Sequence, residues 1–291
     1  MKNWQLSLSN VSAYSRLMRM EKPIGIYLLL WPTMWALWIA AAGFPDWHLL
    51  FVFILGVVIM RGAGCVINDY ADREFDGHVE RTKHRPIPAG EASATEALQL
   101  FGVLIVSAFL LVLTLDIYTI MLSVGGLLLA ASYPFMKRYT HFPQIVLGAA
   151  FSWSIPMAFM ATSGKLDQIV WLLYLANLIW TLAYDTLYAM VDRDDDLKIG
   201  VKSTAIAFGR HDLLAVGLCF AATLALFIYL ALLLGWHWPV YMAIVVTAFM
   251  FCQQIWACRH RDRDACFKAF LSNHYVGLVI FVGLAVEYWA F

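Results

Sequence analysis

The chain has 291 residues, of which 62% are hydrophobic and 14% are charged, and its mean hydropathy is +0.71. Soluble domains contain about 45–50% apolar and about 25% charged residues, so this composition excludes an ordinary water-soluble fold. The formal net charge is zero, which argues against a nucleic-acid binder, because such proteins carry a basic excess. The five cysteines show no CxxC spacing, and we expect neither zinc nor a disulfide.

Apolar stretches near the length of a membrane-spanning helix recur from residue 24 to the C-terminus. The predicted spans are residues 24–43, 48–67, 96–114, 117–135, 143–162, 168–188, 212–235, 238–257 and 270–290. The first is too long for the apolar core of a signal peptide, so we interpret it as a retained helix. The sequence therefore predicts an all-α integral membrane protein with about nine helices and one membrane domain, residues 1–291.

The cations predict how the chain crosses the membrane. Eighteen of the 20 lie before the first span or after the second, fourth, sixth and eighth: Lys2, Arg16, Arg19, Lys22, Arg73, Arg81, Lys83, Arg85, Lys137, Arg138, Arg193, Lys198, Lys202, Arg210, Arg259, Arg261, Arg263 and Lys268. Lys165 falls on the other side, and Arg61 lies within a span. Because positively charged loops stay in the cytoplasm, we expect a cytoplasmic N-terminus and a periplasmic C-terminus in a bacterial inner membrane. Polar chemistry should then sit at the cytoplasmic face.

The second predicted span leads directly into an acidic segment, residues 68–76. Asn68, Asp72 and Asp76 are spaced by four residues, so a helix that continued past the membrane would place all three on one face. Asp69 follows Asn68 directly. The segment therefore offers four oxygen-bearing side chains at one end of a span.

The sixth span ends in a second acidic segment, which reaches residue 196. Tyr184, Tyr188, Asp192 and Asp196 are again spaced by four residues and would share one helix face. A solvated helix end would explain either acidic segment alone. However, acids at a helix C-terminus oppose the helix dipole, and like charges four residues apart destabilise the helix.

Converging carboxylates need a compensating charge. Two unit charges about 4 Å apart repel by about 4 kcal/mol at an effective dielectric near 20. A divalent metal would remove this repulsion, and ligands that are all oxygen atoms suit Mg²⁺, which commonly joins carboxylates to substrate phosphates. We therefore expect an Mg²⁺ site for a diphosphate, with the catalytic acids Asp72, Asp76, Asp192 and Asp196 among the ligands, together with Asn68 and Asp69.

Several cations near the predicted cytoplasmic face could complete a diphosphate clamp. The candidates are Arg19, Lys22, Lys83, Arg85, Lys137 and Arg138. Each is also explained as an ordinary determinant of membrane orientation. Arg61 is different because a cation inside a span is costly and usually faces a cavity or a partner. It lies two helical turns before Asn68 on the same face, so a site role and a structural role both remain open.

Other functional classes find less support in the sequence. Residues 62–64 lack the third glycine and the preceding strand of a dinucleotide site, and the chain contains no Walker A or GxSxG sequence. A transporter would place ionisable residues near the middle of the membrane, where this sequence offers Arg61 and Asp185. A scaffold without enzymatic activity gives no reason for two matched acidic segments.

The patterns NDxxDxxxD, residues 68–76, and DxxxD, residues 192–196, each close an apolar span, and together they resemble the UbiA superfamily of intramembrane aromatic prenyltransferases. The likeness covers essentially the whole chain. The similar stretches are residues 20–25, 64–70, 133–140 and 183–204. They resemble the family members that act on 4-hydroxybenzoate in ubiquinone biosynthesis. One departure is Tyr188, where some relatives carry lysine, and this leaves the acid–base partner at that turn open.

The resemblance implies a bundle of nine helices around a central cavity that opens to the cytoplasm. It also implies Mg²⁺ held through Asn68, Asp72, Asp192 and Asp196, and transfer of a polyprenyl group from polyprenyl diphosphate to the ring carbon ortho to the hydroxyl of 4-hydroxybenzoate. The substrate-binding residues expected are Arg19, Lys22, Arg61, Lys137, Arg138 and Tyr188. A benzoate needs a cation for its carboxylate, because the site already holds many negative charges. An arginine meets a carboxylate in a bidentate manner, and we favour Arg138 for this role over the deeper Arg61.

Overall fold

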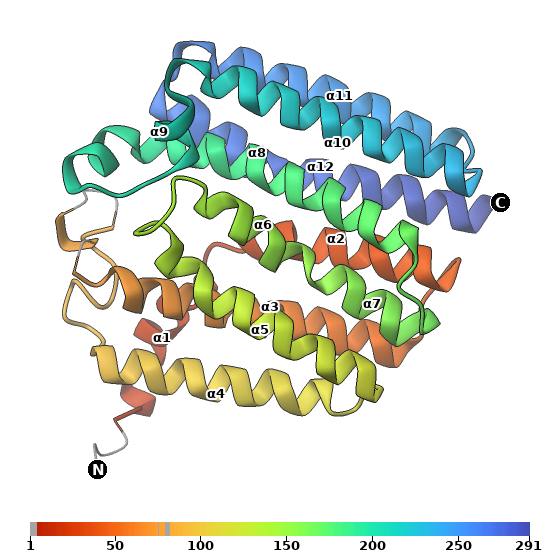
Figure 1. The fold of residues 1–291 in the computed structure, drawn as a ribbon. Coiled ribbons are helices and arrows are strands. Elements are labelled where there is room, and N and C mark those ends of the chain that lie inside the picture. The colour runs from red at the N-terminus through yellow and green to blue at the C-terminus, as the bar shows by residue number, and fades with distance from the viewer. Residues whose placement is uncertain (1–4, 75, 79–81) are drawn as a thin grey trace.

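The computed structural model describes residues 5–74, 76–78 and 82–291, and these residues form a bundle of helices without a strand (Figure 1). The long helices are α2 (Ile24–Ala41), α3 (Trp47–Asp72), α4 (Ala94–Val112), α5 (Ile117–Met136), α8 (Gln168–Ile199), α10 (Asp212–Leu234), α11 (Trp238–Ala257) and α12 (Arg263–Ala290). The shorter helices are α1 (Val11–Leu17), α6 (Pro143–Ser152), α7 (Ser154–Ser163) and α9 (Thr204–Phe208), with the 3₁₀ turns η1 (Leu8–Asn10), η2 (Asp76–His78), η3 (Gly209–His211) and η4 (Cys258–His260). Within the described ranges, nine helical segments are long and apolar enough to cross a membrane, and this confirms the predicted all-α membrane fold.

Short polar residues fix where many of these helices begin. The side chains of Asp46, Asp116, Asp167 and Asp262 each accept a hydrogen bond from a backbone N–H in the first turn of the helix that follows. Such a cap satisfies one of the N–H groups that have no partner within the helix, which matters most where no water can replace it. Residues next to the helix starts therefore determine where these four helices begin.

The fifth predicted span, residues 143–162, is broken in the structure into α6 and α7 at Trp153. Pro156 explains the break because it has no N–H to donate to the carbonyl group of Ser152, four residues earlier. The indole of Trp153 donates a hydrogen bond to the Leu122 carbonyl of α5, at 2.7 Å. The kink thus turns an aromatic side chain towards the interior of the bundle.

Both helices that carry the acidic segments extend beyond their predicted spans. Helix α3 continues from residue 67 to Asp72, and α8 continues from residue 188 to Ile199, where Gly200 follows with a φ of 74°. Hydropathy ends a predicted span where polar residues begin, whereas the helix ends where its hydrogen bonding ends. Asn68, Asp72, Asp192 and Asp196 consequently all lie on helices, as predicted.

Two buried tryptophans hold the centre of the bundle together. Trp35 of α2 and Trp180 of α8 are almost completely buried, with ring centroids 5.5 Å apart. Each indole N–H has a partner, Trp35 on the Gly277 carbonyl and Trp180 on Asn273 of α12. Since an unpaired N–H is expensive in an apolar interior, these bonds fix how α2, α8 and α12 pack.

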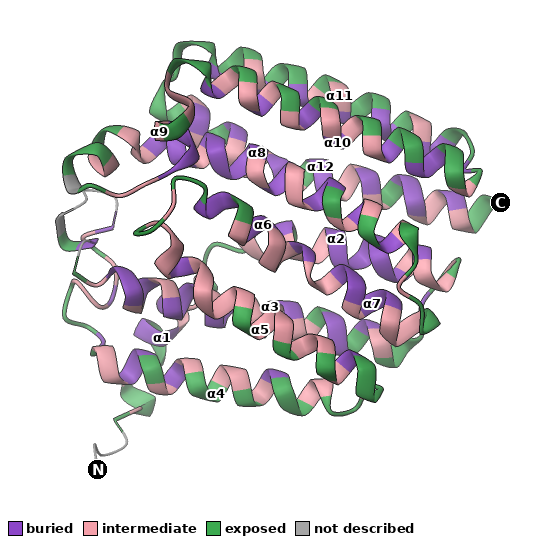
Figure 2. Cartoon of the chain, viewed as in Figure 1, coloured by how far each residue is buried: buried purple, intermediate pink, exposed green. Residues whose placement is uncertain are grey.

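The termini lie at opposite ends of the bundle, as an odd number of crossings requires (Figure 1). The C-terminal ends of α3, α5 and α8 lie at the end of the bundle where the chain starts (Figure 1). Exposed residues are frequent on the outer sides of α4, α10 and α11 (Figure 2), and many of them are large and apolar. An apolar outer surface is what contact with lipid requires.

Candidate functional site

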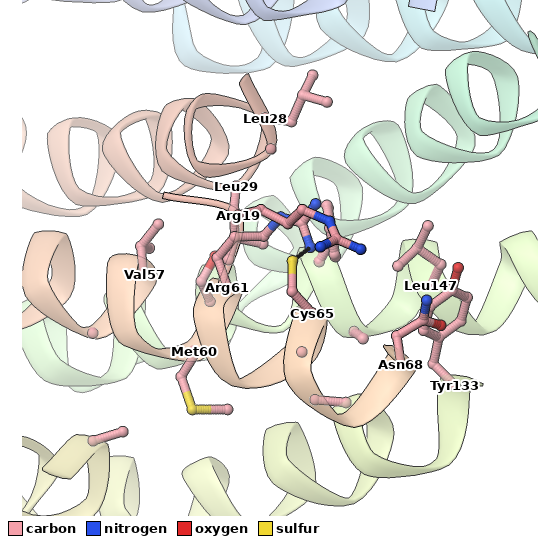
Figure 3. A pocket seen from close by; sticks show the side chains of 18 of the residues that line it. Arg19, Leu28, Leu29, Val57, Met60, Arg61, Cys65, Asn68, Tyr133 and Leu147 are labelled. Carbon is pink, nitrogen blue, oxygen red and sulfur yellow. Dashed lines mark hydrogen bonds between the residues drawn. The ribbon is translucent and has the colours of Figure 1, made fainter. Parts of the chain in front are cut away.

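A cavity of about 1150 Å³ lies inside the bundle, with lining residues from the described helices α1 to α8 and α12. Most of its lining is apolar, with contributions from Val57 of α3, Phe109 of α4 and Leu147 of α6. Its polar lining residues include Arg19, Lys22, Arg61, Asn68, Asp69, Arg85, Asp185 and Tyr188. Figure 3 shows part of this wall, with Arg61 and Asn68 on α3 and Tyr133 on α5. The cavity therefore joins an apolar chamber to a charged end.

The predicted site residues fall into two groups. Six of them line the cavity: Arg19, Lys22, Arg61, Asn68, Asp69 and Tyr188. The others lie outside its lining, at or just beyond the ends of the surrounding helices or, for Asp76, on the turn η2: Asp72, Asp76, Lys137, Arg138, Asp192 and Asp196. Lys83 also lies outside the lining, whereas Arg85 belongs to it.

Asp69 is neutralised by two arginines from outside α3. Arg19 contacts both of its carboxylate oxygens, at 2.8 and 3.0 Å, and Arg85 contacts one of them at 3.0 Å. Arg85 also pairs with Asp76 at 2.8 Å. The backbone of Arg19 has a φ of 58°, an uncommon conformation for a residue with a side chain. These ion pairs fold the N-terminal segment and the loop after α3 over one end of the cavity.

Asp76 does not continue the helix face of Asn68 and Asp72, as the spacing of four residues predicted. Helix α3 ends at Asp72, and Asp76 lies on the separate turn η2. The hydroxyl of Thr82 donates a hydrogen bond to the Asp76 carbonyl, which holds the chain in this turn. Burial raises the pKa of Asp76, although the neighbouring Arg85 opposes the shift.

Asp72 of the first motif has a buried carboxylate oxygen without a hydrogen-bond partner among the described residues. One oxygen forms an ion pair with Lys137, which follows α5. The other, Oδ1, is buried and has no hydrogen-bond partner among the described residues. Arg138 fixes the same helix end by donating to the Ala71 carbonyl, at 2.6 Å. A buried carboxylate oxygen without a donor is costly, which points to a missing cation or donor at this position.

The second motif lies on the last three turns of α8. Asp192 and Asp196 are half-buried, one and two turns beyond Tyr188 of the cavity wall. Between them, Asp194 and Asp195 pair with Arg263 at 3.1 and 3.2 Å, and the Asp194 side chain is 70% exposed. The face that carries Asp192 and Asp196 is therefore less exposed than Asp194 of the same helix end.

The donor set fits a magnesium ion only if substrate oxygens complete it. Among the described residues, no three histidine, cysteine or acidic side chains are grouped closely enough to hold a metal by themselves. Mg²⁺ keeps several waters and typically takes one or two carboxylates together with substrate phosphates. The unpartnered Oδ1 of Asp72 meets that requirement from the side of the protein.

Arg61 points from the middle of α3 into the cavity (Figure 3). It donates a hydrogen bond to the Cys65 sulfur at 2.7 Å, while its Nε is buried without a partner in the described structure. Gly25 makes room for it, because a Cβ atom at that position would overlap the guanidinium. Arg61 therefore lies on the cavity wall, and its role in binding a substrate stays a prediction. Arg138, by contrast, is committed to the end of α3.

Two cavity residues were not among the predicted site residues. Asp185 of α8 and Tyr133 of α5 both line the chamber, and Asp185 is only 9% exposed. A carboxylate within a membrane span is as rare and informative as a cation there, so the rule that singled out Arg61 also applies to Asp185. Tyr133 carries no comparable signal, because tyrosine is common in membrane helices.

The chain is similar to known proteins along nearly its whole length. The model of the UbiA prenyltransferase family matches residues 29–279, most of the chain. The chain belongs to the UbiA prenyltransferase family. It is 60% identical over 287 residues to the 4-hydroxybenzoate octaprenyltransferase of Enterobacter sp. (strain 638), with 99% of each protein covered. It is 58% identical over 288 residues, again with 99% coverage of both, to the protein of the same name from Salmonella paratyphi B.

Solved structures of UbiA homologues share the fold. The apo structure of a homologue from Aeropyrum pernix K1 superimposes with a TM-score of 0.80 at 26% identity, over 90% of this chain and 97% of that one. A homologue from Archaeoglobus fulgidus bound to GPP and Mg²⁺ gives a TM-score of 0.70 at 15% identity, over 95% and 99% of the two chains. The second likeness shows the fold alone. Together they confirm that this chain has the helical bundle of the UbiA family.

Proposed function

We propose that this UbiA-family protein transfers a polyprenyl group from polyprenyl diphosphate to the ring carbon ortho to the hydroxyl of 4-hydroxybenzoate, as a membrane-bound step of ubiquinone biosynthesis. The observation that carries this proposal is the similarity, over 99% of the chain, to proteins named 4-hydroxybenzoate octaprenyltransferase. The cavity agrees with it, because an apolar chamber accommodates a polyprenyl tail and excludes water, while its charged end suits a diphosphate.

Magnesium would be held at the charged end of the cavity. Asn68 and Asp72 of α3 and Asp192 and Asp196 of α8 supply oxygen ligands, and the unpartnered Oδ1 of Asp72 is the observation in their favour. When bound, the ion supplies positive charge for the departing diphosphate. The Archaeoglobus fulgidus homologue bound to GPP and Mg²⁺ supports this assignment. Asp69 and Asp76 have arginine partners instead, and we assign them to the positioning of Arg19 and Arg85.

The chain's own cations would hold the diphosphate while the C–O bond breaks. Arg19 and Arg85 are fixed by Asp69 at the edge of the cavity, and exposed Lys22 lies beside them. Fixed positive groups stabilise charge that develops on the leaving group, because they need no reorganisation when the bond breaks. The apolar walls keep water from the allylic cation that is left behind.

We infer that Arg61, rather than Arg138, binds the acceptor's carboxylate. Arg61 lines the cavity, where its guanidinium donates one hydrogen bond to the Cys65 sulfur, whereas Arg138 caps α3 outside the lining. A guanidinium with donors to spare can grip a carboxylate in a bidentate manner. Gly25 would keep the guanidinium in place from the opposite side.

An assay of purified enzyme with polyprenyl diphosphates of several lengths tests both the reaction and Arg61. The wild type should prenylate 4-hydroxybenzoate much better than phenols that have a neutral group in place of the carboxylate. Arg61→Ala should raise KM for 4-hydroxybenzoate by roughly 10–100-fold, the 1.5–3 kcal/mol of a hydrogen bond to a charged group. It should leave KM for the diphosphate nearly unchanged.

Arg138→Ala is the matched arginine variant in that assay, and it should not weaken acceptor binding selectively. No product from any phenolic acid with the wild type would contradict the proposed reaction. A selective loss of acceptor binding in Arg138→Ala, with Arg61→Ala unaffected, would return the carboxylate to Arg138.

We propose that the acidic motifs face the cytoplasm and that the C-terminus is periplasmic. The cation distribution along the sequence supports this orientation. Reporter domains fused after Arg85, Lys137 and Arg261 should all read as cytoplasmic, and one fused after Phe291 should read as periplasmic. A periplasmic reading at any of the three internal positions would overturn the orientation.

A further inference from the structure

Asp185 is a buried acid on the cavity wall, and the reaction proposed above gives it no role. It lies on α8 among the residues that line the chamber and is only 9% exposed. In the part of the chain that the structure describes, its carboxylate makes neither a hydrogen bond nor an ion pair. Its oxygens are not among the buried polar atoms without a partner, so they keep access to the cavity.

The groups around Asp185 come from two facing helices as well as its own. Arg61 of α3 attracts the Asp185 carboxylate without forming an ion pair. Asp192, two turns further along α8, repels it. Tyr133 of α5 and Tyr184 of α8 lie within electrostatic range of the same carboxylate. The cavity wall contributed by α12 is apolar at this level, with Phe267 and Phe270. Arg61 is therefore the single cation that acts on Asp185 within the described structure.

A buried carboxylate normally recovers its lost hydration through donors or a paired cation. Asp185 has neither, although its oxygens reach a chamber large enough for a substrate. This arrangement fits a ligand that brings its own hydrogen-bond donor to the carboxylate. It also fits an aromatic acid that places its carboxylate on Arg61, because the donor it then offers is the phenol hydroxyl at its other end.

We propose that Asp185 accepts a hydrogen bond from the phenol hydroxyl of the bound acceptor and removes its proton as the ring attacks, so that it is a catalytic base of the transfer. This inference rests on the proposed function. Asp192 and Asp196 remain with the diphosphate in this assignment, one and two turns beyond Tyr188.

The C–O bond between the allylic carbon and the diphosphate breaks, and its electron pair leaves with the diphosphate. The phenol O–H bond breaks, its proton passes to Asp185, and the ortho carbon forms the new C–C bond to the allylic carbon. The resulting dienone loses the hydrogen of that ring carbon as a proton and regains the proton of Asp185 on its oxygen. One proton is released overall, and the carboxylate of Asp185 is restored.

Asp185→Asn tests the assignment with the purified full-length enzyme. Asparagine has nearly the same shape but cannot take the proton, so kcat with 4-hydroxybenzoate should fall by roughly 10²–10⁴-fold, the usual contribution of a general base. KM for the polyprenyl diphosphate should not change. Asp194→Asn is the matched control, since it removes a carboxylate from the outer face of the same helix and should keep wild-type kcat.

A second acceptor separates base catalysis from a structural role. A fluorine beside the hydroxyl of 4-hydroxybenzoate makes the phenol more acidic, so less help from a base is needed. The ratio of wild-type to Asp185→Asn rates should therefore be clearly smaller for this acceptor than for 4-hydroxybenzoate. An equal ratio for the two acceptors, or a kcat close to that of the wild type, would overturn the assignment.

The wild-type enzyme separates failure of this inference from failure of the proposed function. If the wild type forms no prenylated phenolic acid, the proposed function is wrong. If the wild type forms it and Asp185→Asn does so at the same rate, only the role of Asp185 is wrong. Equal unfolding temperatures of the wild type and Asp185→Asn would exclude misfolding as the cause of a lower rate. If Asp185→Asn were less stable and lost the same factor in kcat with both acceptors, Asp185 would instead be a structural support of Arg61.

Discussion

Replacing Asp72 by asparagine should lower kcat by roughly 10²–10³-fold, the cost of removing one group that stabilises the charge developing in the transition state. Asp72 has one oxygen on Lys137 and one, Oδ1, without a partner in the described structure. Asparagine keeps the shape of the side chain but removes the charge that a metal ion would neutralise. Turnover measured over a range of Mg²⁺ concentrations should also show a higher metal requirement in Asp72→Asn.

Binding gives a readout that does not depend on turnover. Mg²⁺-dependent binding of an unreactive diphosphate analogue should weaken in Asp72→Asn, whereas the protein should unfold at nearly the wild-type temperature. Glu74→Gln is a suitable control, because Glu74 is a neighbouring acid that is 67% exposed and pairs with Arg73. Full activity of Asp72→Asn, or wild-type activity after Mg²⁺ has been chelated, would contradict the assignment.

The sequence predicted the fold, and it predicted six residues that line the cavity, because both depend on local patterns. Apolar length determines the spans, and a spacing of four residues places Asn68 with Asp72 and Tyr188 with Asp192 when the helix continues. The prediction that Asp76 shares this helix face was wrong because α3 ends at Asp72. The contacts that hold Asp76 outside the helix come from residues later in the chain. Arg85 and Thr82, from the loop that follows, hold Asp76 in its own turn.

The roles of individual charges could not be predicted from the sequence because they depend on partners from distant segments. Asp69 resembles a ligand in sequence as much as Asp72 does, and only the arrival of Arg19 and Arg85 distinguishes the two. Arg138 follows a span, which predicted a role in binding a carboxylate, and its hydrogen bond to the backbone of α3 could not be read from the sequence. The rule that singled out Arg61, a charge within a membrane span, applies equally to Asp185.

Asp212 should be the most important single carboxylate for the stability of the fold. It is fully buried at the start of α10 and pairs with Arg193 at 2.5 Å and with Arg261 at 2.8 Å. Arg193 lies on α8 between Asp192 and Asp196, and it also donates to the carbonyl groups of Ala205 and Gly209. Asp212→Ala should destabilise the protein by about 1.5–3 kcal/mol, because it removes the carboxylate partner of two arginines whose side chains are 21% and 38% exposed. Thermal unfolding in detergent would measure the loss.

A double-mutant cycle tests whether this loss comes from the ion pairs. Arg261→Ala should cost clearly less in the Asp212→Ala background than in the wild type, since the charge it would leave unpaired is already missing its partner. Asp264→Asn, which removes an exposed acid at the start of α12, should cost no more than about 1 kcal/mol. Because Arg193 connects Asp212 to the end of α8, Asp212→Ala should also raise the Mg²⁺ requirement, as displacement of Asp192 and Asp196 would. Additive costs in the cycle, with an unchanged Mg²⁺ requirement, would show that Asp212 neither anchors Arg261 nor orients the second acidic motif.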